Sequence, residues 1–91
     1  MLTNNKRKVY KRIMDGKEIY NMRIKLGLSQ GELAKEMDLH MNQIHRHEND
    51  KIKSALAKSK FENNLIKNVL EPRGLSVDDF KLTMGVVNEL E

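Results

Sequence analysis

Three capping boxes divide this sequence into helical segments. In each one a Ser or Asp stands three residues before an acidic residue, as in Asp15–Glu18, Ser29–Glu32 and Ser76–Asp79. Such a pair predicts the start of a helix, because each side chain accepts a hydrogen bond from the other residue's backbone N–H. Proline occurs once, at Pro72, and apolar residues recur at spacings of three and four. We therefore predict an all-α protein.

The domain boundaries follow from the same signals. A chain of 91 residues fits one domain. We expect a basic arm or short helix over residues 1–14 and a single helical domain over residues 15–91. Its fourth helix would be extended and would end near Pro72, and its last helix would span residues 77–90.

Composition excludes several classes of protein. The chain has no cysteine, which excludes disulfide scaffolds, zinc fingers and thiol catalysis. The longest apolar run is Ala55–Ala57, too short for a membrane helix or a secretory signal. We expect a cytoplasmic protein with no membrane partner.

Charge alternates along the chain. Residues 1–25 carry eight basic and two acidic side chains, and residues 51–70 carry five basic and one acidic. Residues 26–50 and residues 71–91 each carry two basic and five acidic side chains. Two basic blocks thus flank an acidic one. A polyanion partner would explain this layout, and a mixed solvated surface is the alternative.

The segment from Met22 to Asn49 predicts two short helices joined by a brief turn. The second helix would place Ile44 and His47 inward and polar side chains outward. This is the layout of a helix-turn-helix, in which one helix enters the major groove of double-stranded DNA and the other braces it.

The run Arg23-Ile24-Lys25-Leu26-Gly27-Leu28-Ser29-Gln30-Gly31-Glu32-Leu33-Ala34 resembles the signature of the XRE family, which includes the lambdoid phage repressors and Cro proteins. Ile44 and Glu48-Asn49 fall at the family's spacing, and the resemblance covers residues 17–50. It implies a five-helix domain of the lambda-repressor type and a transcriptional regulator.

The resemblance also implies roles for individual residues. The base-facing positions of the second helix are Met41, Asn42, Gln43 and Arg46. Arg46 can bond both acceptors of guanine, and Asn42 can pair with adenine. The alternatives are a solvated cation for Arg46, a helix cap for Asn42 and a local gap-filler for Met41.

Phosphate contacts are expected from the start of the bracing helix and from the basic segment after Asn49. The candidates are Gln30, Lys51, Lys53, Lys58 and Lys60. A solvated face is the alternative for each lysine. The N-terminal arm can also enter a groove, as basic arms do.

The family pattern pairs Arg23 with Glu48 between the first and third helices. We assign this ion pair a structural role, since a partly buried pair mainly fixes helix orientation.

Four residues depart from the family pattern. Asp38 and Asp50 replace glycines, and Asp tolerates the left-handed backbone region better than most residues. His40 replaces the usual Ser or Thr cap and is expected to weaken the start of the helix. His47 stands where a large apolar residue is usual.

No motif supports an enzyme, a metal site, a cofactor or a small-molecule substrate. His45 and His47 are two residues apart and point to different helix faces. A pH switch at His47 is an alternative to a satisfied interior histidine.

The leading hypothesis is a sequence-specific DNA-binding repressor that occupies an operator as a homodimer. The candidate dimer surface lies on the expected last helix and comprises Phe80, Leu82, Met84 and Val87. The alternative for this helix is that it packs back on its own domain. The alternative is an antitoxin or antirepressor-like module whose main task is to bind another protein.

Overall fold

The computed structural model describes residues 6–10, 13–81 and 83–88. The helices and strands are β1 (Lys6–Tyr10), α1 (Gly16–Lys25), α2 (Gln30–Met37), α3 (Met41–Glu48), α4 (Ala55–Leu65) and β2 (Thr83–Asn88). The part of the chain from 13 to 81 is all-helical, which confirms the predicted class for this body of the molecule. None of its helices combines the length and the apolar character needed to cross a membrane.

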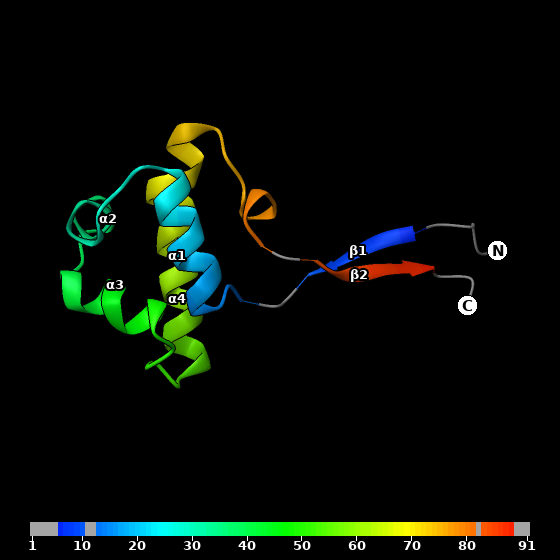
Figure 1. Ribbon diagram of the computed structural model, residues 1–91, viewed down its shortest axis with the longest axis horizontal. Coiled ribbons are helices and arrows are strands. Elements are labelled where there is room, and N and C mark those ends of the chain that lie inside the picture. The colour runs from blue at the N-terminus through cyan, green and yellow to red at the C-terminus, as the bar shows by residue number, and fades with distance from the viewer. Residues whose placement is uncertain (1–5, 11–12, 82, 89–91) are drawn as a thin grey trace.

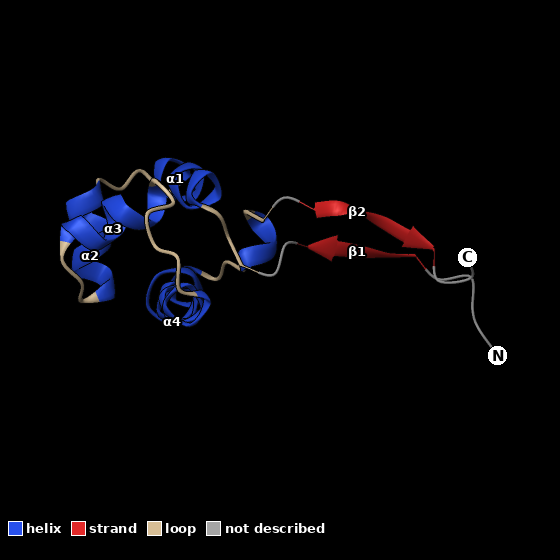
Figure 2. Ribbon diagram, turned by 90° about the horizontal axis from the view of Figure 1, so that it is seen from below, coloured by secondary structure: helices blue, strands red, loops and turns tan. Residues whose placement is uncertain are grey.

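Figure 1 shows α2 and α3 together on one side of α1 and α4, with the strand pair on the opposite side. The view from below places the strands in the same way (Figure 2). The end of the molecule that carries α3 is therefore remote from β1 and β2.

The two capping boxes that open α1 and α2 are confirmed. The Glu18 N–H donates to Asp15 Oδ1 over 2.8 Å, and the Asp15 N–H donates to Glu18 Oε1 over 2.9 Å. Ser29 and Glu32 repeat this exchange at α2. Just after α1, Gly27 has φ +72°, the left-handed conformation that ends a helix at low cost with glycine.

The core is built from apolar side chains of α1 to α4 and of the helical turns that follow α4. Buried members are Met14, Ile19, Met22, Leu33, Ala34, Met37, Ile44, Phe61, Leu65, Val69 and Leu70. Along the chain they recur at spacings of three and four, as in Ile19 and Met22 or Phe61, Leu65 and Val69, which is the periodicity expected of helices. Because they come from every helix, the core fixes α2 and α3 to α1 and α4.

The fourth helix is extended, as predicted. Ser54 caps it through a hydrogen bond of 3.1 Å from the Ala57 N–H. After α4 the chain continues as a π-helical turn over Ile66–Leu70 and a 3-10 turn over Glu71–Arg73. This helical stretch ends at Gly74, which has φ +70°.

The predicted helix over 77–90 is wrong. The third capping box forms, but Ser76 opens only a 3-10 turn over Val77–Asp79. The chain then enters β2, which pairs antiparallel with β1 and places Val9 opposite Gly85. Glycine and β-branched valines disfavour a helix here and permit a strand, and the pairing partner lies at the other end of the sequence. The expectation of a short helix over 1–14 is likewise wrong for Lys6–Tyr10.

Candidate nucleic-acid interface

Three residues, Asp38 to His40, join α2 to α3. Asp38 adopts φ 56°, so the left-handed turn expected of it is confirmed. The Leu39 N–H then returns to Ala34 O over 2.8 Å, and the Leu39 side chain packs against the core. This anchored turn sets α3 at a fixed angle to α2.

His40 caps α3, although histidine is not one of the usual capping residues. Its Nδ1 accepts a hydrogen bond of 3.1 Å from the Asn42 N–H. In return, the His40 N–H donates to Gln43 Oε1 over 3.3 Å. Imidazole nitrogen thus replaces the hydroxyl oxygen of the usual cap, an option that a scan for Ser, Thr, Asp or Asn overlooks.

The inner side of α3 is held by the predicted Arg23–Glu48 pair. Arg23 Nε lies 2.6 Å from Glu48 Oε2, and Arg23 Nη2 lies 3.1 Å from Glu48 Oε1. Only 10% and 4% of these side chains are exposed, and hydrogen bonding to Glu48 raises the pKa of Arg23. Arg23 Nη1 also donates to Leu28 O over 3.0 Å. The pair therefore joins α1, the turn before α2 and the end of α3.

Gln30 belongs to this network. Its Nε2 donates to Glu48 Oε1 over 3.0 Å at the first residue of α2. The amide that was expected to contact phosphate is therefore partly engaged within the protein.

His47 occupies the position of a core residue. Its ring stacks on Phe61 of α4, with 3.9 Å between ring centroids and 23° between planes. Burial lowers the pKa of His47, with smaller contributions from the positive charges of Arg46 and Lys58. The neutral ring serves as an aromatic packing partner, which accounts for a histidine where an apolar residue was expected.

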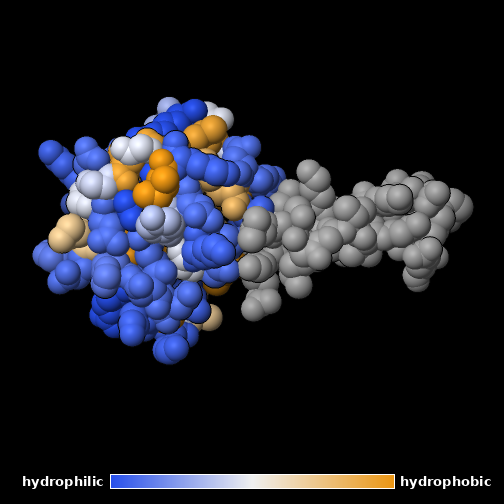
Figure 3. Space-filling model, in the orientation of Figure 1, coloured by the Kyte–Doolittle hydropathy of each residue, from blue (hydrophilic) through white to orange (hydrophobic). Residues whose placement is uncertain are grey.

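The outer side of α3 carries the predicted base-facing residues. Met41 is 49% exposed, and Asn42, Gln43 and Arg46 are also exposed. Gln43 differs from the other three because its amide oxygen accepts a hydrogen bond from the His40 N–H in the cap of α3. Figure 3 shows that the side of the molecule bearing α2 and α3 is mostly hydrophilic.

Two open grooves flank this outer side. One, of about 280 Å³, runs between α3 and α4 and includes Leu39, Gln43, Arg46, Ile52, Lys60 and Asn64 in its walls. The other, of about 410 Å³, runs between α3 and α1 and includes Lys17, Tyr20, Gln30, His45 and Asn49. The exposed side of α3 is therefore bordered by two hollows, and Gln43 and Arg46 line one of them.

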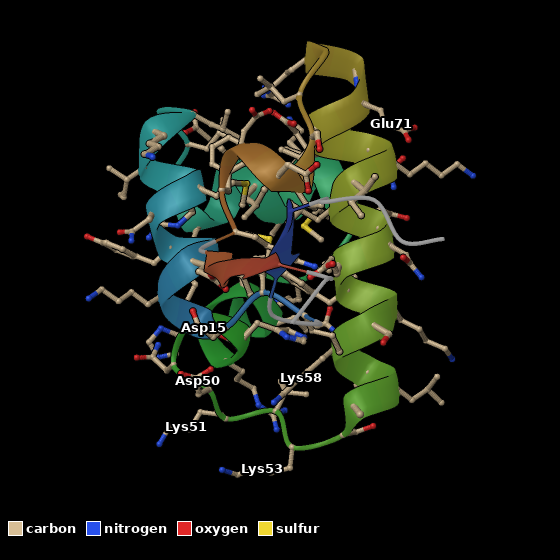
Figure 4. The ribbon with its side chains drawn as sticks, turned by 90° about the vertical axis from the view of Figure 1, so that its right-hand side faces the viewer. Asp15, Asp50, Lys51, Lys53, Lys58 and Glu71 are labelled. Atoms are coloured by element: carbon tan, nitrogen blue, oxygen red, sulfur yellow. The ribbon has the colours of Figure 1, made fainter. Side chains whose placement is uncertain are left out.

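The candidate phosphate-binding lysines differ in exposure. Figure 4 shows Lys51 and Lys53 extending outward where α3 joins α4, whereas Lys58 lies within the outline of the body. Lys51, Lys53 and Lys60 are exposed, and Lys58 is half-buried beside the cavity that His47 and Glu62 also line. The first three lysines are thus better placed for a partner than the fourth.

Gly16 and Asp50 hold the C-terminal end of α3 against the start of α1. A Cβ at Gly16 would come within 2.2 Å of Glu48 O, so only glycine permits this approach. Asp50 has φ 55°, and its Oδ1 accepts the Gly16 N–H over 3.0 Å. No local pattern in the sequence indicates this contact, because the two residues are 34 positions apart.

Glu62 connects the two chain segments that lead to the strands. Its Oε1 accepts the Met14 N–H over 2.7 Å, and its Oε2 lies 2.9 Å from Lys81 Nζ. No local sequence signal marked this residue.

The predicted dimer residues do not lie together on one helix. Phe80 is half-buried and packs against the core of its own chain. Met84 and Val87 belong to β2, and Leu82 lies outside the described residues.

No protein-family model matches the chain, and neither does a curated protein or a solved structure. In the described part of the chain, no three His, Asp or Glu side chains are grouped so as to hold a metal ion. The geometry around α3 is therefore the observation from which a function can be inferred.

Proposed function

We propose that this protein is a sequence-specific double-stranded DNA-binding regulator that represses transcription in the cytoplasm by occupying an operator. The observation that carries the proposal is the division of α3. Its inner side is fixed by Ile44, His47 and Glu48, while its polar outer side is bordered by two grooves. A helix that enters the major groove, which is about 12 Å wide, must present its outer side in this way.

In this proposal the chain is a variant of the five-helix lambda-repressor type. Helices α1 to α4 correspond to the first four helices, and the turn Val77–Asp79 takes the place of the fifth. α2 braces α3, which acts as the recognition helix.

Arg46 and Asn42 carry most of the proposed base recognition. Arg46 would donate to the two acceptors of guanine, and Asn42 would pair with adenine. Met41 would contact a thymine methyl group. Gln43 contributes mainly its Nε2 donors, because its oxygen already accepts the His40 N–H.

Lys51, Lys53 and Lys60 are the proposed phosphate contacts. Their charges are exposed on the connection after α3 and on α4, and they would release counterions from the DNA backbone. Gln30 can add a contact while its amide remains tied to Glu48.

The proposed regulator acts as a homodimer, because one recognition helix reads only a few base pairs. The chain forms β2 within the segment where a C-terminal helix was expected, so that helix does not supply the dimer interface.

Selection from random duplex DNA tests the proposal, followed by affinity measurements between about 50 and 200 mM salt. We expect one enriched motif, with an affinity that falls steeply with salt because several phosphate contacts are made. A repeat within the motif at about one helical turn would report the dimer. No enrichment and a flat salt dependence would contradict the proposal, and capture of a protein partner under those conditions would favour the antitoxin-like alternative.

A further inference from the structure

The N-terminal cap of α3 depends on a neutral imidazole. His40 Nδ1 is the acceptor for the Asn42 N–H, at 3.1 Å. A histidine can accept at Nδ1 only when its proton is on Nε2, because both nitrogens of a charged ring are donors. Protonation of His40 therefore removes this hydrogen bond and places a donor opposite the Asn42 N–H.

A positive charge is also unfavourable at this end of a helix. The N-terminus of a helix carries partial positive charge, and α3 has no acidic residue in its first turn to offset an added cation. Histidine side chains in general change charge between pH 5 and 8, so a histidine cap, unlike a serine cap, can be sensitive to acid.

The first turn of α3 has little else to hold it. The helix has eight residues, and Ile44 is its only fully buried one. Met41, Asn42 and Gln43 are all exposed, and the second half of the capping box, from the His40 N–H to Gln43, is long at 3.3 Å. The cap therefore has more influence on this turn than it would have on a buried helix.

The charged groups around His40 and the other α3 histidines belong to several elements. Lys35, Glu36 and Asp38 precede His40 at the end of α2, and Glu36 is held by Arg73 at 2.6 Å. On the far half of α3, His47 shares cavities with Lys58, Glu62, Arg46 and Lys60, and His45 shares a groove with Lys17, Arg23, Glu48 and Asp50. His45 and His47 are the other histidines of α3, so a test of His40 must leave both residues unchanged.

We propose that His40 is a positioning residue for DNA recognition, whose neutral ring fixes the first turn of α3 and whose protonation releases that turn. The inference rests on the proposed function. DNA would bind the protein when the first turn of α3 is capped, so the apparent affinity for DNA would fall as the fraction of capped protein falls. In acid the native protein would then bind DNA more weakly than a variant in which serine replaces His40 as the cap.

Amide hydrogen exchange tests the cap without DNA. A helix cap is worth about a five-fold change in the local opening equilibrium, within a range of roughly two- to thirty-fold. At pH 7.5 we expect H40A to lower the protection factors of Asn42 and Gln43 by about that much, and H40S to restore them. At pH 5.5 the protection of the native protein should fall toward that of H40A, while H40S stays protected. Equal protection of the native protein and H40S at both pH values would overturn the proposal.

DNA binding tests the functional part. The readout is the ratio of the dissociation constants of the native protein and H40S on one duplex from pH 7.5 to 5.5. Both proteins retain His45 and His47, so the ratio isolates His40. We expect a ratio near one at pH 7.5 that rises about two- to five-fold at pH 5.5. A flat ratio, or tighter binding by the native protein in acid, would overturn the proposal. Absence of DNA binding by either protein at pH 7.5 would instead count against the proposed function, and the exchange experiment would still decide the cap.

Discussion

The two sides of α3 differ in what their side chains do for the fold. On the inner side Ile44 is fully buried, His47 stacks on Phe61, and Glu48 accepts hydrogen bonds from Arg23 and Gln30. On the outer side Met41, Asn42 and Arg46 are exposed. The contrast teaches that one short helix can separate stability from recognition, so that substitutions on one side should leave the other property unchanged.

The largest effect is expected on the inner side. Arg23→Ala leaves Glu48 buried without its charged partner and should lower the free energy of unfolding by about 3–5 kcal/mol, measured by urea denaturation. Arg73→Ala is the matched control. It breaks the Arg73–Glu36 pair, whose side chains are 32% and 31% exposed, and should cost about 0–1 kcal/mol. Equal losses for the two variants would contradict the structural role of the inner pair.

The next effect is expected on the outer side. Arg46→Ala should weaken binding to the selected duplex by about 1–3 kcal/mol and relax the preference at one base pair. Its unfolding free energy should change by less than about 0.5 kcal/mol, because the side chain is exposed. Lys53→Ala should instead weaken selected and random duplexes alike and lower the salt slope by about one. If Arg46→Ala destabilises the fold or leaves specificity intact, the division of α3 is wrong.

The turns at the two ends of α3 sharpen the comparison. Asp38 and Asp50 have φ values of 56° and 55°, where glycine is less strained. Asp38→Gly should therefore stabilise the protein by about 0.5–1 kcal/mol in thermal or urea unfolding. Asp50→Gly should gain nothing or lose stability, because Asp50 Oδ1 accepts the Gly16 N–H. A similar gain from both substitutions would show that this contact with α1 contributes nothing.

The smallest effect concerns pH. Burial lowers the pKa of His47 below its ordinary 6.5, so the unfolded chain binds a proton before the folded one does. The stability from its neutral ring is present above about pH 6.5 and is lost as pH falls through the lower folded pKa. The native protein should therefore lose stability relative to His47→Phe as the pH is lowered, measured as the difference between their unfolding free energies. A difference that does not change between pH 7.5 and 5 would contradict this packing role.

Local signals predicted the helical body well. Asp15, Ser29 and Gly27 have strong conformational preferences of their own, and the core positions follow from helical spacing. The pairing of Arg23 with Glu48 was predicted only through the family resemblance.

The failures share a physical cause. The strand β2 depends on β1 at the far end of the chain, and Glu62 joins two segments that approach only after folding. The His40 cap depends on a tautomer and ring orientation that its neighbours do not specify. Contacts between distant residues, and side chains with more than one bonding state, are beyond what local patterns report.

Backbone amide chemical shifts, recorded as the selected duplex is added, show which residues meet DNA. We expect the largest shifts in α3 from Met41 to Arg46 and at the first turn of α2, with smaller shifts at Lys51 and Lys53. Shifts centred on the strand pair or on α1, with α3 unchanged, would contradict the proposed role of α3 as the recognition helix.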